Sequence, residues 1–180
     1  MQLPMRWGVT EDEIARAYPC DGELAGHGAQ IFRAVTVHAE PSVVFRWLCQ
    51  LSVAPYSYDL VDNLGRRSPQ TLTPGADQLA LGQPMMAIFR LVGFTAGADL
   101  TVRMRSGCGR SMFGDLAVTY AVRPGPDASS RLVAKIVLEP ARSRLGRARV
   151  VALAWGDLVM MRKQLRTLRD LAQAQASPTR

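Results

Sequence analysis

The chain has 180 residues and a net charge of +7 at pH 7, with 48% hydrophobic and 21% charged residues. This length suits one domain with a sizeable core, and the composition is far from that of a disordered chain. Residues 1–13 lack an apolar run behind a basic start, and no run of about 18 apolar residues occurs anywhere, so we expect neither an export signal nor a membrane span.

Cysteine and histidine are scarce in the chain. Cys20, Cys49 and Cys108 are odd in number and widely spaced, and neither His27 nor His38 belongs to an H-E-x-x-H motif. Zinc and redox sites need ligands paired at short spacing. We therefore expect no metal, no cofactor and no disulfide framework, and we expect the protein to be cytoplasmic.

The N-terminal part is expected to contain a short helix and the first strand. Thr10 and Glu13 have the spacing of a capping box, which predicts a helix over residues 10–17. Pro19 stops that helix, because proline lacks the amide hydrogen that a helix interior requires. Residues 29–39 are rich in β-branched and aromatic side chains, which favours a strand.

Two short helices are expected after this strand. Pro41 suits the first turn of a helix, and apolar residues recur behind it at helical spacing. The segment Tyr56–Leu64 again has helical spacing and ends at Gly65, a common helix stop. The stretch 66–82, which contains prolines and glycines, is expected to be a loop.

From residue 84 the apolar period changes to two. We expect strands at residues 84–92, 98–105, 112–123 and 131–139. In the second of these strands Leu100, Val102 and Met104 alternate with polar residues. The alternation predicts an antiparallel meander with one buried face and one face in water.

The last element is an amphipathic helix over residues 145–173, which would span about 40 Å if Gly146 and Gly156 do not kink it. Its apolar stripe comprises Val151, Trp155, Leu158, Met161, Leu165, Leu168 and Ala172. Residues 142–169 also carry eight basic residues against one acid, Asp157. We interpret these charges as a solvated helix face, and a surface for nucleic acid, an acidic partner or an anionic membrane is the alternative.

These elements predict an α+β fold in which a curved antiparallel sheet wraps around a long C-terminal helix. We expect a single domain over residues 1–180. Residues 1–28 would form an N-terminal extension with a short helix, residues 29–173 the core, and residues 174–180 a flexible tail.

Three stretches carry a resemblance to a known family. They are residues 56–59 (YSYD) with 62–65 (DNLG), the central strands, and residues 155–165 (WGDLVMMRKQL). With them the chain resembles the SRPBCC or START-like superfamily, whose fold is called helix-grip or birch-pollen-allergen-like, and especially its bacterial polyketide cyclase/dehydrase and lipid-transfer-like branch. The similarity covers roughly residues 30–172. It implies an elongated apolar cavity between sheet and helix, where members bind lipids, hormones or polyketides and a few catalyse ring closure.

Three polar residues are candidates for contact with a ligand in such a cavity. Tyr56 and Tyr58 combine an apolar body with a hydroxyl group, which can orient a bound molecule. Asp59 would have a raised pKa if it faced the cavity and is the candidate acid or base. In the alternative interpretation the tyrosines pack a short helix and Asp59 caps it or pairs with an arginine.

Apolar residues from the strands and the last helix are the candidates for the cavity wall. They are Phe89, Val118, Tyr120, Trp155, Val159 and Met161. Methionines are frequent near these positions, and their unbranched side chains adapt to ligands of varied shape. The register of the strands decides which of these side chains point inward.

The sequence predicts a protein that binds a hydrophobic molecule such as a lipid, isoprenoid or polyketide, with transport or sequestration as the role of that binding. The alternatives are a polyketide cyclase, aromatase or dehydratase, and an interaction module that uses the basic helix. We expect a hydrophobic small molecule as partner, no specific nucleic acid, no integral membrane association, and a monomer or homodimer.

Overall fold

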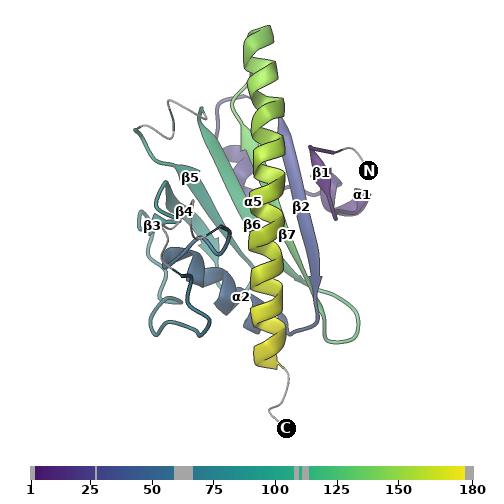
Figure 1. Cartoon of the computed structure of the whole chain (residues 1–180), viewed down its shortest axis with the longest axis vertical. Coiled ribbons are helices and arrows are strands. Elements are labelled where there is room, and N and C mark those ends of the chain that lie inside the picture. The colour runs from purple at the N-terminus through teal and green to yellow at the C-terminus, as the bar shows by residue number, and fades with distance from the viewer. Residues whose placement is uncertain (1–2, 27, 59–66, 108–109, 111–113, 177–180) are drawn as a thin grey trace.

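The computed structural model describes residues 3–26, 28–58, 67–107, 110 and 114–176. A seven-stranded sheet has the order β1-β2-β7-β6-β5-β4-β3, and a long helix, α5, runs across it (Figure 1). The strands are β1 (Arg6–Trp7), β2 (Gln30–Val37), β3 (Pro84–Met85), β4 (Phe89–Thr95), β5 (Asp99–Met104), β6 (Leu116–Pro124) and β7 (Ser130–Leu138). The helices are α1 (Glu11–Ala15), α2 (Pro41–Cys49), α5 (Arg144–Ala176) and the short 3₁₀ turns η1 (Pro19–Gly22) and η2 (Gln50–Ser52). The α+β architecture expected from the sequence is confirmed.

The sheet is antiparallel from β2 to β3, and β1 adds a parallel edge strand beside β2. The stretch 84–92, expected to be one strand, is divided into β3 and β4. Met86 and Ala87 lie between them with φ angles of 45° and 62°. Such left-handed backbone cannot continue a strand, which explains the division.

The short helices near the N-terminus form as expected. The hydroxyl of Thr10 accepts a hydrogen bond from the Glu13 amide, and the Glu13 carboxylate accepts one from the Thr10 amide, which completes the capping box of α1. Pro41 occupies the first turn of α2. Of the helix expected at Tyr56–Leu64, residues 56–58 are not helical and the remainder lies outside the described residues.

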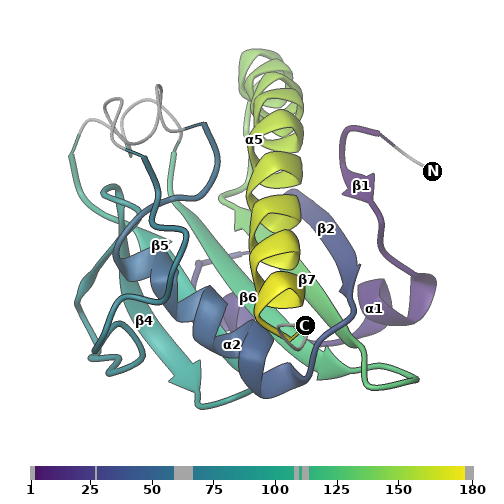
Figure 2. The ribbon, with the colours of Figure 1, turned by 60° about the horizontal axis from the view of Figure 1, so that its bottom comes forward.

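Helix α5 is unbroken over 33 residues, so neither Gly146 nor Gly156 interrupts it, and it continues to Ala176 beyond the expected end. Its second half packs on the sheet and beside α2 (Figure 2). The side chains that it buries there include Leu158, Met161, Leu165, Leu168 and Ala172. The first half extends past α2, and most of its residues are exposed.

The expectation that one face of the sheet lies in water is wrong for β2, β7 and β6. The N-terminal segment covers that face over these three strands and forms a second core, in which Cys20 is fully buried, whereas Arg90 and Arg105 on the β4 and β5 side are exposed. The Cys20 amide donates to Thr119 at 2.9 Å, and Lys135 pairs with Asp21 at 2.6 Å. Thr119 and Lys135, which alternate with apolar residues along β6 and β7, therefore meet polar partners from this segment and not solvent.

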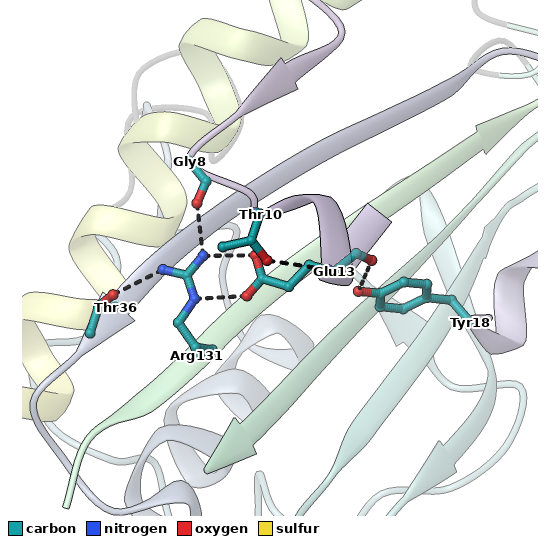
Figure 3. Close-up of polar contacts among 6 residues, drawn as sticks. All are labelled: Gly8, Thr10, Glu13, Tyr18, Thr36 and Arg131. Atoms are coloured by element: carbon teal, nitrogen blue, oxygen red, sulfur yellow. Dashed lines mark hydrogen bonds and ion pairs between the residues drawn. The ribbon is translucent and has the colours of Figure 1, made fainter. Parts of the chain in front are cut away.

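A network of charged hydrogen bonds attaches the N-terminal segment to the sheet (Figure 3). Arg131 of β7 contacts both carboxylate oxygens of Glu13, at 2.7 and 2.9 Å. The same guanidinium donates to the Thr36 hydroxyl and to the carbonyl of Gly8. Burial raises the pKa of Glu13, but Arg131 and Thr10 lower it more, so the net pKa is below its usual value. Residues 8–13 are thus held against β2 and β7.

Candidate ligand cavity

A cavity of about 680 Å³ lies between the sheet, helix α5 and the segment 86–89. Its lining is mainly apolar. The strands contribute Ile31, Phe89, Met104, Leu116, Val118, Ile136 and Leu138, and α5 contributes Ala152, Leu153, Met160 and Met161. A cavity of this size and character suits a small molecule with a large apolar surface.

Helix α5 supplies one long wall of the cavity. Its lining residues extend from Arg149, through Leu153 and Asp157, to Gln164. These positions recur every three or four residues, so they share one face of the helix. At about 1.5 Å per residue, that wall is roughly 22 Å long. The cavity is therefore elongated along the helix axis.

One polar cluster lies where Gln164 meets the sheet. The Tyr120 hydroxyl donates to the Gln164 side-chain oxygen at 2.8 Å, and the Gln164 amide donates to the carbonyl of Pro55 at 2.7 Å. Burial raises the pKa of Tyr120 above its usual value, so its hydroxyl stays neutral. This cluster satisfies its own main hydrogen bonds and fixes the segment at Pro55 against α5.

A second polar group is an ion pair between the sheet and the helix. Arg33 of β2 is fully buried, and its Nη2 lies 2.9 Å from Oδ2 of Asp157. The guanidinium also donates to the carbonyls of Phe32 and Ala154, at 3.0 and 3.1 Å. Asp157 lines the cavity and keeps 23% of its side chain exposed. Arg33 therefore holds a carboxylate at the cavity wall.

The surroundings of Asp157 change its acidity. Burial raises the pKa of this carboxyl to about 6, against the opposing effect of Arg33. Water solvates a carboxylate better than an apolar cavity does, which favours the protonated form. Asp157 thus changes protonation near neutral pH and has the acidity of a group that accepts or releases a proton there.

Other reactive side chains are poorly placed for chemistry. Cys20 and Cys49 are buried and free, and burial raises the pKa of both thiols, to about 12 at Cys49. A thiol of that kind is a weak nucleophile. Within the described residues, no group of three or more His, Cys, Asp or Glu side chains is arranged to hold a metal ion. In that same part of the chain, no helix combines the length and hydrophobicity needed to cross a bilayer.

Comparison with known proteins rests on structure alone. No protein-family model and no curated protein matches the chain. A protein from Thermobifida fusca with an NMR structure aligns over 84% of this chain and 97% of its own, with 16% identity and a TM-score of 0.54. Ara h 8.0201 aligns over 81% and 97%, with 9% identity and a TM-score of 0.50. The Zhui aromatase/cyclase from a Streptomyces species aligns over 83% and 96%, with 11% identity and a TM-score of 0.50.

The chain has the helix-grip fold. The resemblance in the sequence pointed to this fold, and the structure and its neighbours confirm it. In this helix-grip chain α5 is the gripped helix, and the cavity lies mainly along its N-terminal half, from Arg149 to Gln164.

Four of the residues expected in the wall of the helix-grip cavity do line it. They are Phe89, Val118, Tyr120 and Met161. Tyr56 is buried against Trp47, with ring centroids 6.3 Å apart, and Tyr58 is 42% exposed. Neither tyrosine lines the cavity, whereas Pro55 and Ser57 do. Asp59 lies outside the described residues.

The cavity position expected for Trp155 and Val159 is not found. The two side chains are 50% and 52% exposed on the outer side of α5. Trp155 is two residues from both Leu153 and Asp157, which turns it about 200° around the helix from each of them. The apolar residues expected to form one stripe on this helix therefore lie on two sides of it. Some face the cavity, and Trp155 and Val159 face outward.

Three residues of the site were missed from the sequence. Arg33 lies in the otherwise apolar strand segment 31–35, and Asp157 is the single acid among eight basic residues. Gln164 lies seven residues beyond Asp157 on the same helix face. Arg33 is a lone basic residue in a buried strand, and Asp157 is a lone acid in a basic helix. These opposite charges could have suggested an ion pair between them.

Proposed function

We propose that the cavity binds a largely apolar small molecule, such as a lipid, isoprenoid or polyketide. The observation that carries this proposal is the elongated cavity of about 680 Å³ with its apolar lining. Its volume falls within the range of about 300 to 1,000 Å³ that is common for small-molecule sites. Burial of apolar ligand surface would supply most of the binding free energy.

The methionines support a site that adapts to its ligand. Met86, Met104, Met160 and Met161 all line the cavity. Unbranched thioether side chains repack at little cost around ligands of different shape. The wall therefore suits a family of related apolar molecules as well as a single one.

Binding is tested by titrating the folded protein with N-phenyl-1-naphthylamine, whose fluorescence rises in an apolar site. We expect saturation at one probe per chain. Gly156 lines the cavity, and a Cβ at this position would meet no heavy atom within 4 Å. Gly156→Phe should therefore fill part of the space and weaken binding at least about tenfold, as loss of a well-packed apolar ligand ring would.

The matched control is Gly22→Phe. A Cβ at Gly22 also meets no heavy atom within 4 Å, and this residue belongs to the N-terminal segment on the opposite face of the sheet. Its affinity for the probe should equal that of the wild type. No saturable uptake by folded wild-type protein, or an equal loss of affinity in both variants, would contradict binding in this cavity.

An enzyme of the cyclase, aromatase or dehydratase type is the second candidate. The observation that favours it is the Asp157 carboxyl, which lines the cavity and has a pKa of about 6. This activity is assayed as ring closure of a linear poly-β-ketone, and the absorbance of the aromatic product measures the rate. Asp157→Asn should abolish turnover while the fluorescent probe still binds, and an undiminished rate would remove Asp157 from any mechanism. Asp59 remains a second candidate acid to be tested in the same way.

A surface interaction is the remaining candidate. Val151, Trp155 and Val159 are about half exposed along one side of α5, within the strongly basic stretch of the chain. Exposed apolar side chains among arginines suit the surface of an anionic membrane. The wild type should sediment with phosphatidylserine vesicles but not with vesicles of phosphatidylcholine alone. Trp155→Ala should no longer sediment with phosphatidylserine vesicles. Equal binding of the wild type to both lipids would contradict a membrane-binding surface.

We propose that the protein is located in the cytoplasm. Free buried thiols at Cys20 and Cys49 agree with the cytoplasm, where cysteines remain reduced. A monomer or a homodimer is proposed, and light scattering separates the two.

A further inference from the structure

We propose that the Asp157–Arg33 pair selects ligands that carry a hydroxyl group partway along an otherwise apolar skeleton. The Asp157 carboxylate would accept the hydrogen bond, and Arg33 would be a positioning residue that holds the carboxylate in place. The inference rests on the proposed binding function and adds the polar group that the ligand must present.

The geometry leaves one carboxylate oxygen for a ligand. Oδ2 of Asp157 is enclosed and lies against Arg33 at 2.9 Å. The side chain nevertheless keeps 23% exposure and lines the cavity. The accessible part of the carboxylate is therefore on the Oδ1 side. Arg33 itself is fully buried, so a ligand meets the carboxylate and not the guanidinium.

The charge balance of the pair points to a neutral donor. An anionic ligand would be repelled by Asp157, which it meets first. A cationic ligand would gain little, because Arg33 already compensates the carboxylate at 2.9 Å. A wholly apolar ligand would remove water from the free oxygen without replacing its hydrogen bond, which is costly for a charged group. A hydroxyl or phenol satisfies the oxygen and adds no charge.

The position of Asp157 sets where the hydroxyl must lie. Asp157 is about two turns from both Arg149 and Gln164 along the wall of α5. At the far end Tyr120 and Gln164 already bond to each other and to Pro55. At the near end Arg149 is paired with Glu139 at 3.8 Å. The carboxylate is thus the acceptor that a ligand meets between two apolar stretches.

The test compares 2-naphthol with naphthalene, measured by displacement of N-phenyl-1-naphthylamine. The readout is the ratio of the two affinities, which cancels effects on general apolar binding. Replacing the pair by apolar residues, in Arg33→Met with Asp157→Leu, should lower the ratio about tenfold or more, because a hydrogen bond to a charged group is lost. Both residues are changed so that no buried charge is left alone.

The control replaces a matched ion pair on the opposite face of the sheet, in Lys135→Met with Asp21→Leu. That pair is similarly buried, with side chains 4% and 31% exposed. Its ratio should stay at the wild-type value. An unchanged ratio in the Arg33 and Asp157 variant, or an equal fall in both variants, would overturn the inference.

A wild-type comparison keeps the inference testable if the double variant does not fold. 2-Methoxynaphthalene keeps the ring and the oxygen of 2-naphthol and loses the donor. The wild type should bind 2-naphthol more tightly, although the ether is the more apolar molecule, and tighter binding of the ether would overturn the inference. If wild-type protein binds neither naphthalene nor 2-naphthol, the proposed function itself fails.

Discussion

Arg33 and Asp157 form an ion pair of 2.9 Å that joins the second strand to the C-terminal helix across the core. Arg33 has no exposed side-chain surface, and Asp157 has 23%. A buried charge is tolerated when a partner compensates it, and removing one partner costs much more than removing both. The same ion pair thus stabilises the fold and holds the Asp157 carboxylate at the cavity wall.

The first prediction concerns the stability of single and double variants of this pair. Asp157→Leu alone should lower the free energy of unfolding by about 3 to 5 kcal/mol, because Arg33 is left as an uncompensated buried charge. Adding Arg33→Met should restore most of that loss. Urea unfolding measures both values. Equal unfolding free energies for the single and double variants would contradict the coupling.

The second prediction concerns pH. Because burial raises the pKa of Asp157 from 3.8 to about 6, the folded protein holds this proton more tightly than the unfolded chain does. Binding of this proton therefore stabilises the folded state fully at a pH below the pKa of Asp157 in the unfolded chain. That stabilisation is lost as pH rises through the pKa of Asp157 in the folded protein. The unfolding free energy of wild type minus that of Asp157→Asn should fall by about 2 kcal/mol between about pH 4 and pH 7. Glu13 titrates in both proteins and cancels, so a flat difference would contradict the raised pKa.

The third prediction separates stability from binding at Gly156. Alanine has a higher helix propensity than glycine by about 1 kcal/mol, and a Cβ here meets no heavy atom within 4 Å. Gly156→Ala should raise the free energy of unfolding by about 0.5 to 1 kcal/mol, while the affinity for N-phenyl-1-naphthylamine changes less than in Gly156→Phe. A destabilised alanine variant would show that this part of α5 is packed more tightly than the structure indicates.

The fourth prediction concerns the N-terminal segment. Glu13→Gln weakens the two contacts with Arg131 and should lower the free energy of unfolding by about 1 to 3 kcal/mol. Hydrogen exchange should become faster in residues 8–24, and probe affinity should not change because the cavity lies on the other face. Glu11→Gln is the control, since Glu11 forms an exposed ion pair with Arg6 that contributes little. Equal effects of the two substitutions would contradict the special role of Glu13.

Periodicity predicted most of the fold. The spacing of apolar residues located α2 and α5, enrichment in β-branched and aromatic residues located β2, and the Thr10–Glu13 pair located the start of α1. Two-residue strands such as β1 have no periodicity to detect. The covered outer face was also missed, because Lys135 and Thr119 look like solvent-facing residues until Asp21 and Cys20 are folded onto them.

The site was less predictable than the fold. Met161 was located because it belongs to the apolar stripe of the last helix, and Val118 because it lies in an expected strand of the meander. Trp155 was misplaced because an amphipathic stripe does not say which apolar residues face the sheet and which face outward. Arg33 and Asp157 were missed because their pairing depends on how a strand and a distant helix meet, and that is a property of tertiary structure.

Methyl NMR on protein labelled at methionine tests the central claim of a ligand cavity most directly. Of the eight methionines, Met86, Met104, Met160 and Met161 line the cavity, whereas Met5 lies beside β1. Titration with N-phenyl-1-naphthylamine should shift those four methyl signals with one common saturation curve and leave Met5 unchanged. Saturable shifts at Met5 alone, or no shifts in well-folded protein, would contradict a binding cavity between the sheet and α5.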